Sequence, residues 1–121
     1  MDAPRFELPE ELEEFRRLVR EIAEEKIAPR ATEIDRTDEW PEDLYRLLVE
    51  NELMSVGYPE EYGGSGGGSL AFGVLIEELS RASAGFALTP LVARLGAIPV
   101  MLAGTEEQRR WVIGGICRGE L

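Results

Sequence analysis

The chain has 121 residues, of which 24 are acidic and 13 are basic, so its formal net charge is −11 at neutral pH. Hydrophobic residues make up 44% of the sequence and charged residues 31%, a balance typical of a globular protein. We expect residues 1–121 to form one domain around one core. The negative charge repels phosphate backbones and anionic lipid headgroups, so neither nucleic acid nor a membrane surface is expected as a partner.

The sequence lacks the residues of most hydrolytic sites. It contains no histidine, which excludes a Cys-His pair, a Ser-His-Asp triad and the Glu-x-x-His pattern of di-metal bundles within this chain. Cys117 is the only cysteine, so no internal disulfide can form, and we interpret it as a small apolar core residue. This cysteine usage predicts a reducing, cytoplasmic environment.

Neither a signal peptide nor a membrane span is expected. The first five residues, Met-Asp-Ala-Pro-Arg, lead into acidic residues rather than into an apolar run. We expect no apolar stretch of 18 residues, the length that a transmembrane helix needs. We therefore expect a protein that stays in solution.

An amphipathic helix is predicted from Pro9 to Pro29. Proline suits a first-turn position, and acidic residues follow it, where they complement the positive end of the helix dipole. Pro29 should kink or end the helix, since it lacks the backbone donor. Apolar residues recur at intervals of three and four, as expected for one buried stripe: Leu12, Phe15, Leu18, Val19, Ile22, Ala23 and Ile27.

Trp40-Pro41 predicts the start of a second helix that ends near Asn51. Residues 52–57 are too short to decide between a helical turn and an extended segment, although the following proline favours the extended form. Residues 62–69 hold five glycines, so this loop is either mobile or held for a structural reason. Ser69 is predicted to cap a third helix, buried on most sides and rich in apolar residues from Leu70 to Leu79.

Residues 83–103 carry one charge, Arg94, and two prolines. We predict two short, mostly buried helices that are interrupted between Gly96 and Pro99. Gly104 should end the second of them, and residues 105–108, Thr-Glu-Glu-Gln, form a capping box for a last helix. The apolar residues of that helix are Trp111, Val112, Ile113, Ile116 and Cys117.

Nucleotide-binding motifs are weak or missing. Gly66, Gly68 and Ala71 match G-x-G-x-x-A, but a dinucleotide site needs a preceding strand and a later acid, and position 88 is leucine. No phosphate-binding G-x-x-x-x-G-K-[ST] loop exists. The glutamates of the first helix are interpreted as a solvated face rather than as acid-base pairs.

The weakly charged segment 85–102 has two interpretations. It either belongs to a plain core, or one side of it faces an apolar ligand or a missing partner domain.

Several segments together resemble the N-terminal helical domain of the acyl-CoA dehydrogenase flavoproteins, over nearly the whole chain. They include an acidic first helix ending in Ile-Ala-Pro-Arg-Ala at 27–31, Tyr-Pro-Glu-Glu-Tyr-Gly-Gly at 58–64, and Ile-Glu-Glu-Leu-Ser-Arg at 76–81. The resemblance continues with Leu-Ala-Gly-Thr-Glu-Glu-Gln-Arg at 102–109 and with Gly-Glu at 119–120. The longer glycine run at 66–68 departs from the family pattern, and it leaves the course of this loop open.

This resemblance implies an all-α fold, an orthogonal or up-down bundle of about five to six helices. It also implies that the intact enzyme adds a β-barrel domain and a C-terminal helical bundle, binds FAD and removes α and β hydrogens from an acyl-CoA, in fatty acid metabolism. The flavin-holding segments and the catalytic glutamate belong to the later domains, so no catalytic or cofactor-binding residue transfers to this chain, and no FAD is expected on the chain alone. By position, four residues would form a wall of the acyl pocket: Leu88, Leu91, Val92 and Leu95.

Two hypotheses follow from the resemblance. In the first, residues 1–121 are the N-terminal domain of such an oxidoreductase, which is inactive alone and belongs to an enzyme that could form a homo-oligomer. In the second, the chain is a free-standing helical module without enzymatic activity, which docks onto a flavoprotein subunit or holds a fatty acyl chain. Neither hypothesis specifies the acyl chain length or the electron acceptor.

Overall fold

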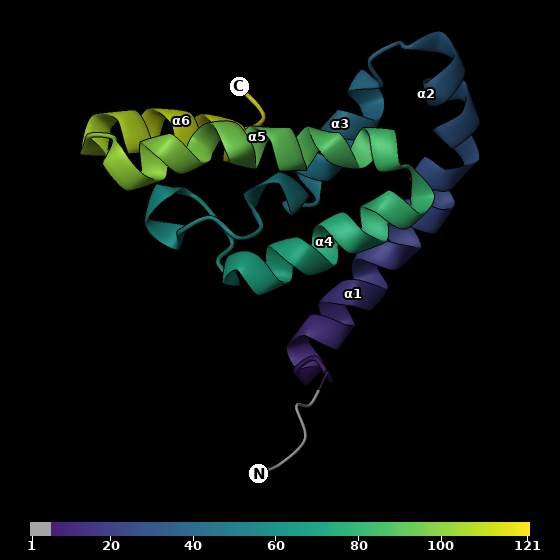
Figure 1. Cartoon of the computed structure of the whole chain (residues 1–121), viewed down its shortest axis with the longest axis horizontal. Helices are drawn as coiled ribbons and strands as arrows, with labels where there is room; N and C mark the ends of the chain where they lie inside the picture. The colour runs from purple at the N-terminus through teal and green to yellow at the C-terminus, as the bar shows by residue number, and fades with distance from the viewer. Residues whose placement is uncertain (1–5) are drawn as a thin grey trace.

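The structure is a computed structural model that describes residues 6–121, so the expectation about a signal peptide in the first five residues lies outside the described part. Six α-helices, labelled α1 to α6, are joined by short π-helical and 3-10 turns. Val56 and Gly66 form an isolated parallel bridge, and no β-strand is formed between residues 6 and 121. The predicted all-α fold of about five to six helices is therefore confirmed (Figure 1).

The first predicted helix is one helical run of changing pitch. α1 spans Glu10–Ile22 and continues as a π turn over Ala23–Ile27 and a 3-10 turn over Ala28–Arg30, before α2 begins at Ala31–Thr37. The change of pitch surrounds Pro29, which cannot donate a hydrogen bond to the preceding turn. The expected kink at this proline thus takes the form of a local change in helix type.

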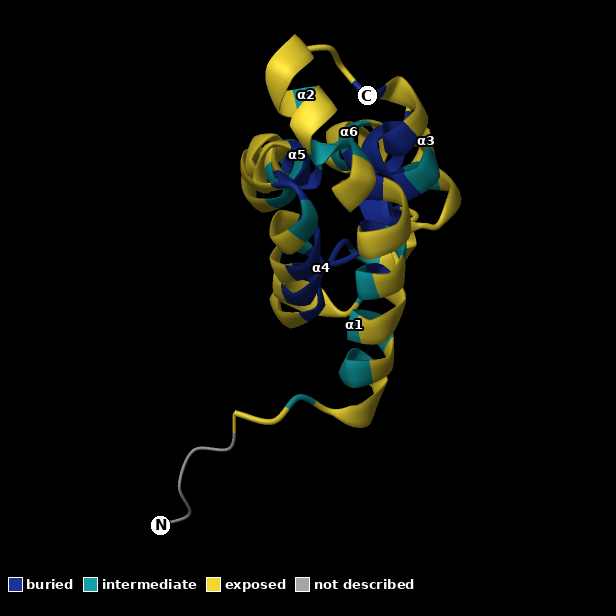
Figure 2. Ribbon diagram, turned by 90° about the vertical axis from the view of Figure 1, so that its right-hand side faces the viewer, coloured by how far each residue is buried: buried dark blue, intermediate teal, exposed yellow. Residues whose placement is uncertain are grey.

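α4, Gly68–Ala82, packs along α1 and lies between α1 and α5. Figure 2 shows its buried side turned toward the interior. The predicted cap at Ser69 is wrong: Gly67 occupies the cap position with a left-handed backbone, and no side chain caps the helix. The glycine run therefore supplies the backbone conformation that begins α4.

α3 spans Glu42–Glu50, close to the predicted range, and Pro41 stands just before it. The undecided segment 52–57 forms a 3-10 turn at Leu53–Ser55 and is then extended at Val56, so both alternatives occur in turn. A second 3-10 turn at Glu60–Tyr62 leads into the glycine loop.

α5 is a single helix from Ala84 to Ala103, so the predicted interruption between Gly96 and Pro99 is wrong. Both prolines, Pro90 and Pro99, lie inside it. A proline inside a helix costs about 3 kcal/mol of helix stability. Packing against neighbouring helices along the whole length of α5 outweighs this cost. α5 contacts α4 and α6, and also α2.

α5 is also less buried than predicted. Its buried residues are Phe86, Ala87, Pro90 and Ala97, whereas five large apolar side chains are exposed: Leu88, Val92, Leu95, Ile98 and Leu102. The helix is long and apolar enough to cross a membrane, with a mean hydropathy of 1.7, which corrects the expectation that no such stretch exists. One such helix is weak evidence for a span, because core helices pass the same test.

α6, Glu106–Arg118, begins with the predicted capping box between Thr105 and Gln108, and Gly104 ends α5 as predicted. Cys117 is buried, as expected for a core residue. Trp111, by contrast, is exposed. The main core lies between α1, α3, α4 and α6 together with the inner side of α5.

A buried carboxylate connects α1 and α4. Glu78 is 1% exposed, and its two oxygens accept hydrogen bonds from Nε and Nη2 of Arg20, both at 2.9 Å. Arg81 donates a third bond at 3.1 Å, and Arg16 lies 3.8 Å away. No local pattern in the sequence distinguishes this glutamate from its exposed neighbour Glu77.

Candidate functional site

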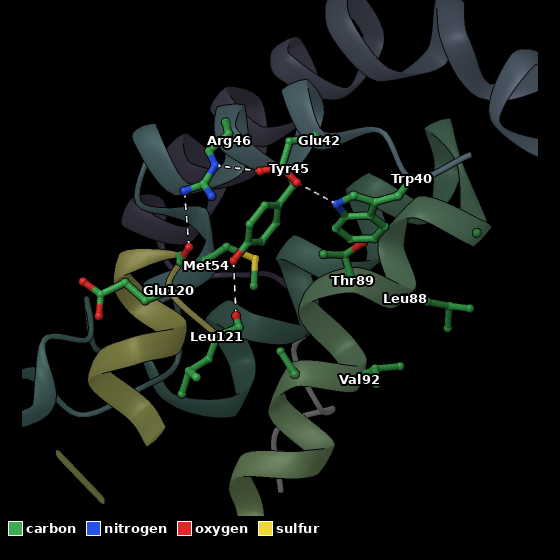
Figure 3. Close-up of a pocket in the computed structure, with 13 residues that line it drawn as sticks. Trp40, Glu42, Tyr45, Arg46, Met54, Leu88, Thr89, Val92, Glu120 and Leu121 are labelled. Atoms are coloured by element: carbon green, nitrogen blue, oxygen red, sulfur yellow. Dashed lines mark hydrogen bonds and ion pairs between the residues drawn. The ribbon is translucent and has the colours of Figure 1, made fainter. Parts of the chain in front are cut away.

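A groove of about 530 Å³ lies between α3, α5 and the last residues of the chain (Figure 3). α3 contributes Tyr45, and α5 contributes Leu88 and Val92. The 3-10 turn at Leu53–Ser55 contributes Met54. Most of the lining surface is apolar, which suits an apolar ligand or a packed protein surface.

Polar contacts hold one wall of the groove in place. The indole N–H of Trp40 donates to Glu42 at 3.0 Å, and Nε of Arg46 donates to the other oxygen of Glu42 at 2.9 Å. Nη1 of Arg46 donates to the Gly119 carbonyl at 3.2 Å, and the Tyr45 hydroxyl donates to the Leu121 backbone oxygen at 3.3 Å. These bonds connect α3 to residues 119–121, so the aromatic end of the groove is preorganised (Figure 3).

The four predicted wall residues do not share one environment. Leu88 and Val92 line the groove at its rim, on the outer side of α5 (Figure 3). Leu95 is exposed on the same side of α5 but does not line the groove, and Leu91 is half-buried against the core. The structure therefore places Leu88, Val92 and Leu95 on one exposed side and Leu91 at its inner edge.

The other wall of the groove was not predicted from the sequence. Trp40, which predicts only the start of a helix, packs beside Tyr45 with 5.7 Å between the ring centroids. Met54 completes this wall, and Thr89 of α5 also lines the groove. An exposed tryptophan next to a proline-initiated helix was the available signal, but only the fold shows that it faces α5.

The two glutamate carboxylates that line the groove are both bonded to other side chains. Glu42 accepts from Trp40 and Arg46. Glu120 pairs with Arg118 at 2.9 Å, and this hydrogen bond holds the pKa of Glu120 below its usual value. In residues 6–121, no three His, Cys, Asp or Glu side chains gather to hold a metal ion. The apolar part of the lining suits an apolar group.

The first part of the glycine loop packs against the segment that precedes it. The amide N–H groups of Gly64, Ser65 and Gly66 donate to the carbonyls of Pro59, Ser55 and Tyr58, at 3.0, 2.9 and 3.0 Å. A side chain at Gly64 would come within 2.1 Å of the Tyr58 carbonyl oxygen, so this glycine serves close backbone packing. These three amides are therefore used inside the protein and are not free to bind a ligand.

The described residues thus form an all-α domain that exposes an apolar side of α5 next to a groove. A family model, the acyl-CoA dehydrogenase N-terminal domain, matches residues 9–120. The chain therefore belongs to the acyl-CoA dehydrogenase family and corresponds to its N-terminal domain.

Relatives give the same assignment. The chain is 41% identical over 108 residues to the probable acyl-CoA dehydrogenase FadE25 of Mycobacterium tuberculosis, covering 89% of this chain and 28% of that protein. It is 38% identical over 113 residues to the 3-(aryl)acrylate reductase of Clostridium sporogenes, covering 92% of this chain and 30% of the reductase.

A solved structure supports the fold. The butyryl-CoA dehydrogenase of Megasphaera elsdenii superposes with a TM-score of 0.83 at 31% identity, covering 96% of this chain and 31% of that one. The chain thus spans less than a third of the length of the relatives that it matches.

Proposed function

We propose that this chain acts as the N-terminal domain of an FAD-dependent oxidoreductase that forms or reduces the α,β carbon-carbon bond of an acyl-CoA or a related acid. The observation that carries the proposal is the uncharged outer side of α5, where Leu88, Val92 and Leu95 are each more than half exposed. Exposed apolar surface on one helix marks a contact with a ligand or another protein surface. Family membership gives the substrate class.

In this proposal the chain supplies a dry, shaped wall for the acyl group. Leu88 and Val92 would exclude water from one side of it, and a dry site strengthens the electrostatic interactions that other groups make with the substrate. The FAD and the carboxylate base would be held by the β-barrel and C-terminal bundle domains, as the resemblance to the family implies. The chain alone would be inactive.

The names of the relatives leave the direction of the reaction and the acyl group open. One matched protein is a butyryl-CoA dehydrogenase, and another is a reductase of 3-(aryl)acrylates. Trp40 and Tyr45 at one end of the groove would suit a ring as well as an alkyl chain, since aromatic pairs form at centroid distances of about 4.5 to 7 Å.

A chimera tests this proposal. Residues 1–121 replace the matching segment of the Megasphaera elsdenii butyryl-CoA dehydrogenase, and the oxidation of butyryl-CoA is followed with an artificial electron acceptor. We expect an active chimera with bound flavin. Val92→Glu should lower kcat/KM at least about tenfold, since a charge in a dry apolar site is strongly disfavoured.

Val92 is a better choice than Leu91, which packs partly against the core, so that a change there would also affect stability. Ser80→Glu, an exposed substitution on α4, is the matched control and should leave kcat/KM unchanged. A flavin-loaded chimera with full activity after Val92→Glu would reject the wall assignment. A folded, flavin-loaded chimera that does not oxidise any acyl-CoA would reject the function and favour a binding module without activity.

A further inference from the structure

Arg94 is the one charged residue of α5, and it lies on the inner side of the helix. Pro90 and Ala97, which precede and follow it by four and three residues, are both buried. Residues at this spacing share one face of a helix, so Arg94 interrupts the apolar stripe that packs against the core. Burying a charge at such a position costs free energy unless hydrogen bonds or other polar contacts compensate for the lost water.

The guanidinium of Arg94 is held by a carbonyl and by two rings. Its Nη1 donates to the Gly57 carbonyl at 3.0 Å. The guanidinium carbon lies 4.5 Å from the centroid of Phe72 and 5.4 Å from that of Tyr58, within the range of cation-π attraction. These contacts join α5 to α4 and to the extended segment before the glycine loop.

Gly57 is matched to this arrangement. Its φ is +82°, which favours glycine, and a side chain there would come within 2.6 Å of Nη1 of Arg94. The space that the glycine leaves open is the space that the guanidinium uses. The same segment also bonds to the glycine loop, because the Gly57 N–H donates to the Gly66 carbonyl at 2.8 Å.

Hydrophobicity alone does not distinguish the two sides of α5. Its outer side carries leucine and valine, and its inner side carries phenylalanine and alanine, so both sides are apolar and they differ mainly in side-chain size. Burial of apolar area is non-directional and therefore discriminates poorly between rotations of the helix about its own axis. A hydrogen bond with a fixed donor and acceptor does discriminate.

We propose that Arg94 is a positioning residue that sets the rotation of α5, and thereby decides that Leu88, Val92 and Leu95 form the exposed apolar wall. The importance of this wall for catalysis rests on the function proposed above, but the geometric role of Arg94 does not. The inference therefore needs a test that involves no substrate.

Thiol labelling of the 121-residue chain provides that test. Leu95→Cys places a thiol on the outer side of α5, where the native side chain is 58% exposed, and Ala97→Cys places one on the inner side, where it is 0% exposed. Each is made in the native background, in Arg94→Met and in Arg94→Lys. Labelling is measured by mass spectrometry, which separates each new thiol from the buried Cys117.

We expect the labelling rate at position 95 divided by that at position 97 to fall about tenfold in Arg94→Met. The loss of one hydrogen bond to a charged group changes an equilibrium constant by about this factor. Arg94→Lys keeps the charge but not the planar stacking, so a smaller fall is expected. Arg110→Met is the control: Arg110 lies 5.8 Å from the Tyr62 ring but belongs to α6, and its loss should leave the ratio unchanged.

All rates are compared at a temperature well below the melting midpoint of each variant, so that a loss of stability alone does not change the ratio. An unchanged ratio in folded Arg94→Met overturns the inference, whatever the change in stability. Should Arg94→Met not fold, an unchanged ratio in Arg94→Lys overturns it. An inactive chimera combined with a reduced labelling ratio would reject the proposed function and retain the role of Arg94.

Discussion

The α1–α4 interface buries a charged group, whereas the outer side of α5 exposes apolar ones. At the interface, the buried Glu78 is neutralised by arginines whose side chains reach it from both helices. On α5, by contrast, large apolar side chains face solvent with no charge among them. The charged groups of the interface thus find their partners within the chain, whereas the outer side of α5 is exposed to solvent (Figure 2).

This difference separates stability from function within one small domain. Residues that stabilise the fold are those whose interactions are complete within the chain. Exposed Leu88, Val92 and Leu95 should contribute little to stability, and under the proposed function they contact the acyl group and other domains. The two regions should therefore respond differently to the same kind of substitution.

The largest difference should come from shortening leucines. Leu75 in α4 is 0% exposed, and Leu75→Ala should lower the free energy of unfolding by about 3–4 kcal/mol through lost burial and a residual cavity. Leu95→Ala should cost less than about 0.5 kcal/mol, because that side chain is mostly exposed. Urea denaturation followed by circular dichroism measures both. Equal losses would contradict the distinction between the two regions.

Removing the buried carboxylate should have a smaller effect. Glu78→Ala removes the hydrogen bonds from Arg20 and Arg81, but both arginine side chains are about half exposed and water can solvate them, so we expect a loss of about 1–2 kcal/mol. Glu77→Ala, one residue earlier and exposed, serves as the control and should be near neutral. If the two substitutions had the same effect on the denaturation midpoint, Glu78 would not stabilise the interface.

The same carboxylate should make stability depend on pH. The Arg20 hydrogen bonds hold the pKa of Glu78 below its ordinary value of 4.5, against the opposing effect of burial. Because the folded pKa is lower than the unfolded one, the stabilisation is fully present above the unfolded pKa and is lost as the pH falls through the folded pKa. The melting temperature of the native chain should therefore fall more steeply below about pH 5 than that of Glu78→Gln. If the melting temperatures of the two proteins fell in parallel with pH, the pH dependence would not come from Glu78.

Helix caps give a smaller effect. Thr105→Ala removes the side chain that accepts from the Gln108 amide and should cost about 1 kcal/mol. Ser69→Ala should cost much less, because Ser69 does not cap α4. Chemical denaturation compares the two, and a larger loss for Ser69→Ala would show that the serine is the true cap.

The elements that local signals define were predictable from the sequence. The capping box at Thr105 is correct, as is the start of α3 after Pro41, because caps and prolines act over a single turn of helix. The same local reasoning failed at α5, where two prolines predicted an interruption. Packing along the whole helix decided that element, and the sequence does not display such packing.

The candidate site was predictable only in part. The resemblance pointed to Leu88 and Val92, which the structure places at the groove, and to Leu95, which it places on the same exposed side of α5. Trp40 and Tyr45 were missed, because their place in the groove depends on α5 and on residues 119–121, which lie far from them in the chain. The buried Glu78, outside the groove, was missed for the same reason, since its partner Arg20 lies 58 positions earlier. Periodicity shows which residues share a face of a helix, but it does not show what that face meets.

The central claim is that the outer side of α5 is covered by acyl group and protein in the intact enzyme. The most direct measurement is the labelling rate of Val92→Cys in the isolated chain, in the Megasphaera elsdenii chimera and in the chimera saturated with butyryl-CoA, with Ser80→Cys as the exposed control. We predict fast labelling in the isolated chain, where the native valine is 57% exposed, slower labelling in the chimera and the slowest with butyryl-CoA. Equal rates in all three would contradict the claim.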